Sequence, residues 1–185
     1  MKEIRLHGRA GQGMVTGAEL IAMAAAYDGK HSQAFPYFGS EKRGPPVEAY
    51  CRVSEHPITI HEEISEPDIV VVADSSIMAE VDVCAGLGKG GILIINTTKG
   101  PEELKLNASK VFTINATEVA LRHFHKLILN TVMLGAFCKI TGIVKLESVK
   151  RAVKEKLSGK FSEKIVEANI AAIQEVYDKV QVEVA

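Results

Sequence analysis

The chain of 185 residues has the length of one globular domain, and we expect a single domain over 1–185. Its 22 Lys and Arg nearly balance its 23 Asp and Glu, so no excess of positive charge indicates a nucleic-acid partner. No apolar run reaches the length of a membrane span, and "MKEIRLHG" opens a strand-like pattern rather than the apolar core of a signal peptide. We therefore expect a cytoplasmic protein without membrane contact.

The first third of the chain predicts a strand, a helix, a second strand and a hairpin. Apolar and charged residues alternate in "EIRLHG", and Met14, Ala18 and Ile21 recur at helical spacing before a natural stop at Gly29. "VEAYCRVS" alternates as a half-buried strand does, and "SEHP" predicts a turn back into "ITIH". The expected elements are a strand ending near Gly8, a helix over 14–27, a strand over 31–36 and an antiparallel hairpin of 47–54 with 58–61.

The remaining two thirds predict strands that alternate with helices. "PDIVVVAD" and "GILIIN" are continuous apolar runs, typical of parallel strands buried on both faces. The alternation indicates an α/β fold: a Rossmann-like, mainly parallel sheet flanked by helices, with the antiparallel hairpin inserted. The further expected elements are a strand over 110–115 and helices over 75–86, 116–126, 130–141, 146–157 and 162–181.

The stretch "HGRAGQG" places three glycines between the first strand and the first helix. A helix start at the carboxyl end of a strand favours anions, and glycine lets the backbone approach a phosphate closely. The spacing, however, is G-x-x-G-x-G, the second strand ends in "AFP" without the acid that binds a ribose, and no Walker A sequence occurs. An enzyme that binds NAD or ATP is therefore not expected. Two interpretations stay open, a packing turn and a loop that contacts an anionic ligand or a partner's cofactor.

A second unusual stretch is the loop within "QAFPYFGSEKRGPPVEAY". It combines two aromatic residues with prolines, glycines and charges, and its cations could join Arg9 in one basic rim around an anion. A solvated loop or a subunit contact would explain it equally well. The candidate binding residues are Gly8, Arg9, Gly11, Gln12, Gly13, Lys42 and Arg43.

Metal chemistry and catalysis by the chain alone are not expected. Cys51, Cys84 and Cys138 are far apart and form no CxxC, so they cannot supply a structural zinc site or a four-cysteine iron–sulfur cluster. His123 and His125 would point to different faces of a helix and make a poor chelate. No catalytic triad or carboxylate dyad is recognisable, and we predict no catalytic residue.

Three stretches in this order, "HGRAGQG", "QAFPYFGSEKRGPPVEAY" and "NTVMLGAF", carry a resemblance that extends over nearly the whole chain. They resemble the gamma subunit of the 2-oxoacid:ferredoxin oxidoreductases, and are most similar to the pyruvate branch, also called pyruvate synthase. The 2-oxoglutarate branch, with its more Gly-rich first loop, fits less well. The sequence departs mildly from the family where Leu129 precedes Asn130 in place of proline, and at Ser40 and Pro45.

The resemblance implies a subunit of an enzyme of anaerobic metabolism. That enzyme converts a 2-oxoacid, coenzyme A and oxidised ferredoxin into an acyl-CoA, carbon dioxide and reduced ferredoxin. Thiamine diphosphate, magnesium and iron–sulfur clusters are implied on other subunits, and no cofactor is expected on this chain alone. The implied partners are the alpha, beta and delta subunits and, through the complex, ferredoxin. Coenzyme A, as substrate, is the anion that the resemblance suggests for the glycine loop.

Three alternatives stay open. The 2-oxoacid could be pyruvate, 2-oxoisovalerate or another acid. The chain could be a pure assembly scaffold, in which the glycine loop only packs. A self-sufficient nucleotide-binding enzyme is the third, and the missing ribose acid counts against it.

Overall fold

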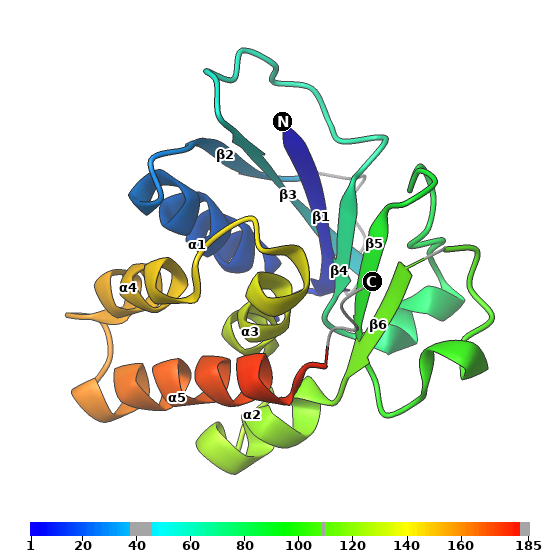
Figure 1. The fold of residues 1–185 in the computed structure, drawn as a ribbon. Coiled ribbons are helices and arrows are strands. Elements are labelled where there is room, and N and C mark those ends of the chain that lie inside the picture. Colours follow the sequence, from blue (N-terminus) through cyan, green and yellow to red (C-terminus); the bar gives the residue numbers. More distant parts are fainter. Residues whose placement is uncertain (38–45, 109, 182–185) are drawn as a thin grey trace.

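The strands of the described residues form one six-stranded sheet in the order β2-β3-β1-β4-β5-β6 (Figure 1). The structure is a computed structural model, and it describes residues 1–37, 46–108 and 110–181. β1, β4, β5 and β6 are parallel, whereas β3 pairs antiparallel with both β1 and β2. This confirms the α/β fold with a mainly parallel sheet. The strands are β1 (Lys2–Arg9), β2 (His31–Pro36), β3 (Pro46–Ser54), β4 (Ile69–Val72), β5 (Ile92–Asn96) and β6 (Lys110–Ile114).

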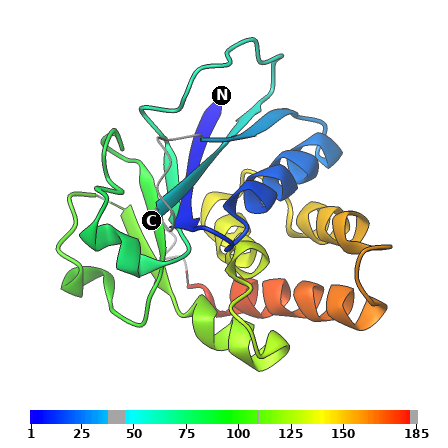
Figure 2. The ribbon, with the colours of Figure 1, turned by 180° about the vertical axis from the view of Figure 1, so that it is seen from behind.

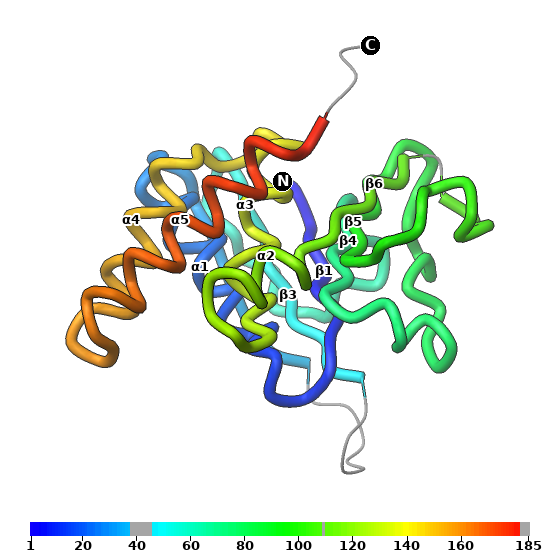
Figure 3. The backbone as a smooth tube through the Cα atoms, turned by 90° about the horizontal axis from the view of Figure 1, so that it is seen from below, coloured from blue at the N-terminus to red at the C-terminus, as the bar shows by residue number. Residues whose placement is uncertain are grey.

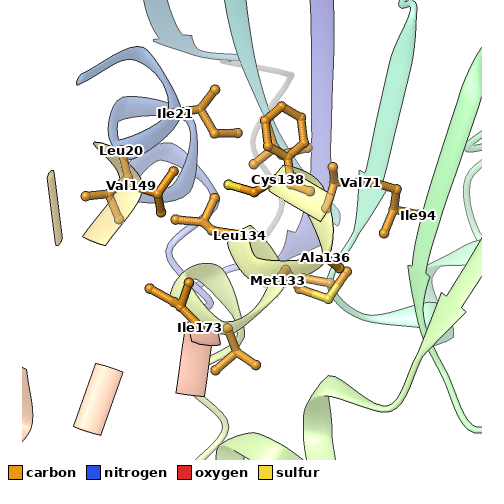
Figure 4. Packing of buried hydrophobic residues seen from close by; sticks show 14 of the residues in the cluster. Leu20, Ile21, Val71, Ile94, Met133, Leu134, Ala136, Cys138, Val149 and Ile173 are labelled. Carbon is orange, nitrogen blue, oxygen red and sulfur yellow. The ribbon is translucent and has the colours of Figure 1, made fainter. Parts of the chain in front are cut away.

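The α-helices of the described residues gather on one face of the sheet (Figures 1 and 2). Their apolar stripes meet the inward side chains of the strands in one large core, and Figure 4 shows part of it, with Leu134 and Cys138 beside Ile21. None of these helices is long and apolar enough to cross a membrane. They are α1 (Met14–Tyr27), α2 (Ala116–Phe124), α3 (Leu129–Thr141), α4 (Leu146–Leu157) and α5 (Glu163–Lys179).

The opposite face of the sheet is covered without α-helices, and the prediction of a helix over 75–86 is wrong. Only a short 3-10 helix, η1 (Ser75–Ala79), forms there, and a second one, η2 (Pro101–Glu103), lies further along the chain. In an α-helix the amide of Cys84 would donate to the carbonyl of Glu80, but here it donates to Oδ1 of Asp82 at 3.0 Å. The carbonyls of Val83 and Ala85 accept hydrogen bonds from the Arg5 guanidinium, at 3.2 and 2.6 Å, and these bonds hold the segment against β1. The extended path also lets Val83 pack into the second, smaller core.

The predicted hairpin of 47–54 with 58–61 is also wrong, because residues 58–61 form no strand. Both edges of β3 are already paired, one with β1 and the other with β2, so no edge is left for a further strand. The antiparallel partner is instead the predicted strand over 31–36, which lies at the edge of the sheet. The segment after β3 is held by Arg52, whose Nη2 donates to the carbonyl of Glu62 at 2.7 Å.

Candidate functional site

The candidate site begins at the loop that joins β1 to α1, at the carboxyl ends of the parallel strands (Figure 3). The strand ends at Arg9, one residue beyond the expected end, and the helix begins at Met14, as predicted. Gly11 and Gly13 have φ angles of 85° and 74°, a left-handed conformation that favours glycine. The amide of Gln12 donates to the carbonyl of Arg9 at 3.0 Å, so this amide closes the turn and is not free for a ligand.

Two of the three glycines lie against neighbouring side chains. A Cβ atom on Gly8 would lie 2.8 Å from the sulfur of Met14, and one on Gly13 would lie 2.6 Å from Nδ2 of Asn130. Among the residues that the structure describes, no atom lies within 4 Å of the corresponding position on Gly11. The packing interpretation of the loop therefore explains Gly8 and Gly13, while Gly11 faces open space.

The close contact at Gly13 also brings two helix starts together. Asn130 lies in the first turn of α3, and Gly13 is the N-cap of α1; neither helix has a side-chain cap. In α1 the first backbone bond runs from the amide of Gly17 to the carbonyl of Gly13, at 2.9 Å. The amides of residues 14–16 therefore have no acceptor inside the helix. Two positive helix ends at one place favour negative charge there.

The side chain of Gln12 ties this loop to the end of β4. Its Oε1 accepts from the amide of Arg9 at 2.7 Å, and its Nε2 donates to Oδ2 of Asp74 at 2.9 Å. Asp74 in turn accepts from both the amide and the hydroxyl of Ser76. Partial burial raises the pKa of Asp74, but the hydrogen bonds from Ser76 and Gln12 and the charge of Arg9 outweigh it, so the net pKa lies below its ordinary value.

The guanidinium of Arg9 is already engaged in an ion pair. Its Nη2 lies 2.7 Å from Oε1 of Glu80, and its Nε lies 3.9 Å from Oδ2 of Asp74. The hydroxyl of Ser76 accepts two further bonds from it. The hydrogen bond to Glu80 is the main reason why the pKa of Arg9 is raised. The side chain remains 34% exposed, so an anion could reach it but would compete with Glu80.

A cavity of about 320 Å³ opens beside the loop, at the carboxyl ends of the parallel strands. Its lining offers hydroxyl and amide groups with one carboxylate, and no Lys or Arg of the described residues lines it. Asn96 organises its floor: the side-chain amide donates to the carbonyl of Ala73 and to the hydroxyl of Thr117, and its oxygen accepts from the amide of Thr117. The lining residues are Gln12, Ala73, Asp74, Ser75, Asn96, Thr97, Thr98, Asn115, Thr117, Leu127 and Leu129.

The structure brings five of the seven predicted binding residues together in the β1–α1 loop. The other two, Lys42 and Arg43, lie outside the described residues, so the basic rim stays a prediction. Of the aromatic pair in the same stretch, Tyr37 is 37% exposed, and its ring packs edge-on against Tyr50, with 5.9 Å between the centroids. Phe38 lies outside the described residues.

One face of β1 and β3 is polar and largely buried, a feature not predicted from the sequence. Arg5 Nε donates to Nε2 of His7 at 2.9 Å, so the proton of this imidazole sits on Nδ1, which lies 3.6 Å from Oε1 of Glu48 and has no hydrogen-bond partner among the described residues. Burial, helped by the charge of Arg5, lowers the pKa of His7 to about 3, and the ring is neutral at pH 7. Polar residues alternate along both strands in the sequence. Which of them face each other, however, depends on the pairing register of β1 with β3, which the sequence alone does not give. The facing pairs are Glu3 with Arg52, Arg5 with Tyr50, and His7 with Glu48.

The cysteines do not fit an iron–sulfur cluster. Burial raises the pKa of Cys51 and of Cys138 to about 12, and burial is also the main cause of the raised pKa of Cys84. Cluster ligation needs thiolates, which this environment disfavours. Across the described residues no three His, Cys, Asp or Glu side chains are grouped to hold a metal ion. Nε2 of His123 instead contacts Oε2 of Glu175, at 2.7 Å.

Known proteins match this chain over nearly its full length. The family model "Pyruvate ferredoxin/flavodoxin oxidoreductase" matches residues 3–179. The "Pyruvate/ketoisovalerate oxidoreductases common subunit gamma" of Pyrococcus abyssi is 48% identical, covering 98% of each chain, and the "Pyruvate synthase subunit PorC" of Methanocaldococcus jannaschii is 47% identical, covering 97% of this chain and 99% of its own. The crystal structure of the pyruvate oxidoreductase subunit PORC of Thermotoga maritima superposes with a TM-score of 0.83 at 35% identity, over 97% of each chain. The chain therefore belongs to the pyruvate ferredoxin/flavodoxin oxidoreductase family.

Proposed function

We propose that this chain is the gamma subunit of a multisubunit pyruvate:ferredoxin oxidoreductase and acts in the cytoplasm with alpha, beta and delta subunits. The observation that carries the proposal is the likeness to separate gamma and PorC chains. In each comparison it extends over nearly the whole length of both chains. In the proposed reaction pyruvate, coenzyme A and oxidised ferredoxin give acetyl-CoA, carbon dioxide and reduced ferredoxin. The chain contributes to this reaction without being catalytic alone.

The cofactors of the reaction would then be held by other subunits. Thiamine diphosphate, magnesium and the iron–sulfur clusters would supply decarboxylation and electron transfer there, and the protonated thiols of Cys51 and Cys138 support a division of labour of this kind. We expect no pyruvate- and coenzyme-A-dependent reduction of viologen by the purified chain, and reduction by the assembled complex. Turnover by the single chain would contradict the proposal.

We further propose that the β1–α1 loop contacts a phosphate of coenzyme A. The first turns of α1 and α3 supply unpaired amides, Gly11 leaves space for the ligand, and Arg9 is partly exposed beside them. Binding would require the phosphate to replace Glu80 as the partner of Arg9. Such an exchange is feasible because this ion pair lies at the surface, where pairs contribute at most about 1 kcal/mol.

Kinetics of an Arg9→Ala complex test this contact. One charge-assisted hydrogen bond contributes about 1.5–3 kcal/mol, so we expect the apparent affinity for coenzyme A to fall roughly ten- to a hundredfold. The apparent affinity for pyruvate would hardly change, since pyruvate reacts on other subunits. Lys2→Ala is the matched control, because Lys2 is an exposed cation at the other end of β1 that pairs with Asp68 at 2.9 Å. An unchanged coenzyme A constant, or a change in the pyruvate constant alone, would refute the contact.

A pure assembly scaffold is the second candidate function. The close packing of Gly8 and Gly13 and the ion pair of Arg9 with Glu80 favour it, because they explain much of the loop without a ligand. In that case Arg9→Ala would lower the yield of assembled complex and leave both substrate constants unchanged.

The choice of 2-oxoacid is a separate question. The relative from Pyrococcus abyssi is by its name common to pyruvate and ketoisovalerate oxidoreductases, so one gamma chain can serve two enzymes. We favour pyruvate for this chain, in keeping with the pyruvate synthase subunit of Methanocaldococcus jannaschii. The test is to purify complexes through this chain and to measure their turnover of pyruvate and of 2-oxoisovalerate. Turnover of pyruvate alone would mean that the chain serves one enzyme, and turnover of both would mean that it can serve two.

A further inference from the structure

The segment that comprises α4 and the start of α5 differs in charge from the rest of the chain. Residues 145–164 contain seven Lys and Arg against three Glu, although the whole chain has a net charge of −1. The remainder of the chain is therefore net acidic. The connection between α4 and α5 lies at the side of the molecule away from the sheet, as Figures 1 and 3 show.

Two large apolar side chains project from this basic end. Phe161 is 52% exposed and Ile165 is 39% exposed, and they lie four residues apart where α5 begins. Phe161 directly precedes the N-cap Ser162, a position from which an apolar side chain often packs onto the first turn of the helix. More than half of Phe161 nevertheless stays in contact with solvent. Single exposed apolar residues are ordinary, but two large ones four residues apart among charged residues favour an interaction site.

The backbone holds Phe161 in this position. The amides of Lys160 and Phe161 both donate to the carbonyl of Leu157, each at 3.1 Å, and a bridge joins Ser158 to Phe161. Gly159 permits the turn with a φ of 78°. The exposed ring therefore belongs to a defined turn with its own hydrogen bonds, and a partner would meet it already positioned.

Some cations of this end have a partner and others do not. Lys156 pairs with Glu19 at 2.7 Å, and the guanidinium of Arg151 lies 4.0 Å from the ring centroid of Tyr27. Another three, which are Lys154, Lys160 and Lys164, are exposed, and their side chains make no ion pair or hydrogen bond within the described ranges. These three lie before, beside and after Phe161 in the chain, and Glu163 is the one exposed glutamate between Lys160 and Lys164, so the turn around Phe161 carries an excess of unpaired positive charge.

We propose that Lys154, Lys160, Phe161, Lys164 and Ile165 form a docking surface for another subunit of the oxidoreductase, one that presents carboxylates around a small apolar pocket. The inference rests on the proposed gamma-subunit function. An apolar centre within a charged rim is the usual anatomy of a protein–protein interface. A nucleic acid would meet a largely acidic molecule beyond this small patch, because the remaining surface is net negative.

The test uses the assembled complex purified through a tag on another subunit, so that retention of the wild-type chain first establishes the proposed function. If the wild-type chain is not retained, the proposed function fails, independently of the surface. If it is retained, we expect the triple variant Lys154→Glu, Lys160→Glu, Lys164→Glu to bind roughly tenfold more weakly or worse, and wild-type binding to weaken with added NaCl. Phe161→Ala should weaken binding roughly tenfold without altering the salt dependence.

Matched controls lie elsewhere on the surface. Lys99→Glu reverses an exposed charge in the connection between β5 and η2, and Leu121→Ala removes a side chain that is 46% exposed on α2; both should assemble as the wild type does. Circular dichroism and the midpoint of thermal unfolding establish that each variant is folded, and a triple Gln variant should give an intermediate affinity. The proposal is overturned if the triple Glu variant and Phe161→Ala assemble normally, or if the controls weaken assembly equally. The proposal would also be overturned if these variants assembled normally but lost a binding to RNA or to anionic vesicles that the wild-type chain shows.

Discussion

Gln12 donates a hydrogen bond from Nε2 to Oδ2 of Asp74 at 2.9 Å, and this contact joins the end of β1 to the end of β4. The same side chain accepts from the amide of Arg9 at 2.7 Å, so one residue fixes both the shape of the glycine loop and its distance from the neighbouring strand. The candidate site is therefore held by a polar side chain within the glycine motif and not by the glycines alone.

Replacement of Gln12 by alanine should destabilise the chain. The variant loses two hydrogen bonds, one of them to a carboxylate, and we expect the free energy of unfolding to fall by about 1–3 kcal/mol, measured by urea denaturation. Gln12→Glu retains an acceptor for the amide of Arg9 but faces Asp74 with a second carboxylate, so at pH 7 it should be no more stable than Gln12→Ala. A Gln12→Ala chain as stable as the wild type would show that the bridge contributes nothing.

Gly13→Ala should be costly for two separable reasons. The left-handed backbone at φ 74° costs a residue with a side chain about 1–2 kcal/mol, and the new Cβ would also meet Asn130 at 2.6 Å. Gly29→Ala is the matched control, because Gly29 has a φ of 78° and a Cβ added there would have no neighbour within 4 Å in the described part of the chain. We expect Gly13→Ala to lower the free energy of unfolding more than Gly29→Ala does. Asn130→Ala in the same chain should remove the difference, and failure of this rescue would place the strain elsewhere.

The acid stability of the chain should depend on Glu175. A hydrogen bond from Lys179, with further support from His123 and the charge of Arg122, lowers the pKa of Glu175 to about 2 from its ordinary value of 4.5. A folded-state pKa below the unfolded one contributes stability that is complete above the unfolded value and is lost as the pH falls toward the folded value. Between pH 4.5 and 2, the free energy of unfolding should therefore fall less steeply in Glu175→Gln than in the wild type.

Urea denaturation at several pH values within this window measures the difference. Glu167→Gln is the control, since Glu167 is an exposed glutamate of the same helix that makes no ion pair with another described residue, and it should leave the acid slope unchanged. If the free energy of unfolding falls equally steeply with pH in Glu175→Gln and in the wild type, the neighbours of Glu175 do not lower its pKa in the folded state.

Local sequence determined much of this fold. The helices over 14–27 and 146–157 have the boundaries that their apolar spacing predicts, because amphipathic periodicity and flanking glycines act within a few residues. The continuous apolar runs likewise became β4 and β5, since such runs are typical of parallel strands buried on both faces. The order of the three quoted stretches was sufficient to indicate the family that full-length comparison then established.

Tertiary structure decided what depended on partners distant in the sequence. Residues 83 and 85 are held against β1 because Arg5, some 80 positions earlier, donates to their carbonyls, and residues 58–61 form no strand because β3 has no free edge. In the candidate site, Arg9 pairs with Glu80 across 71 positions, a contact that no local pattern encodes. Periodicity specifies which face of an element is apolar. Which polar groups meet on the other face is decided only when the chain folds, and these contacts determine the charge and the hydrogen bonding of a site.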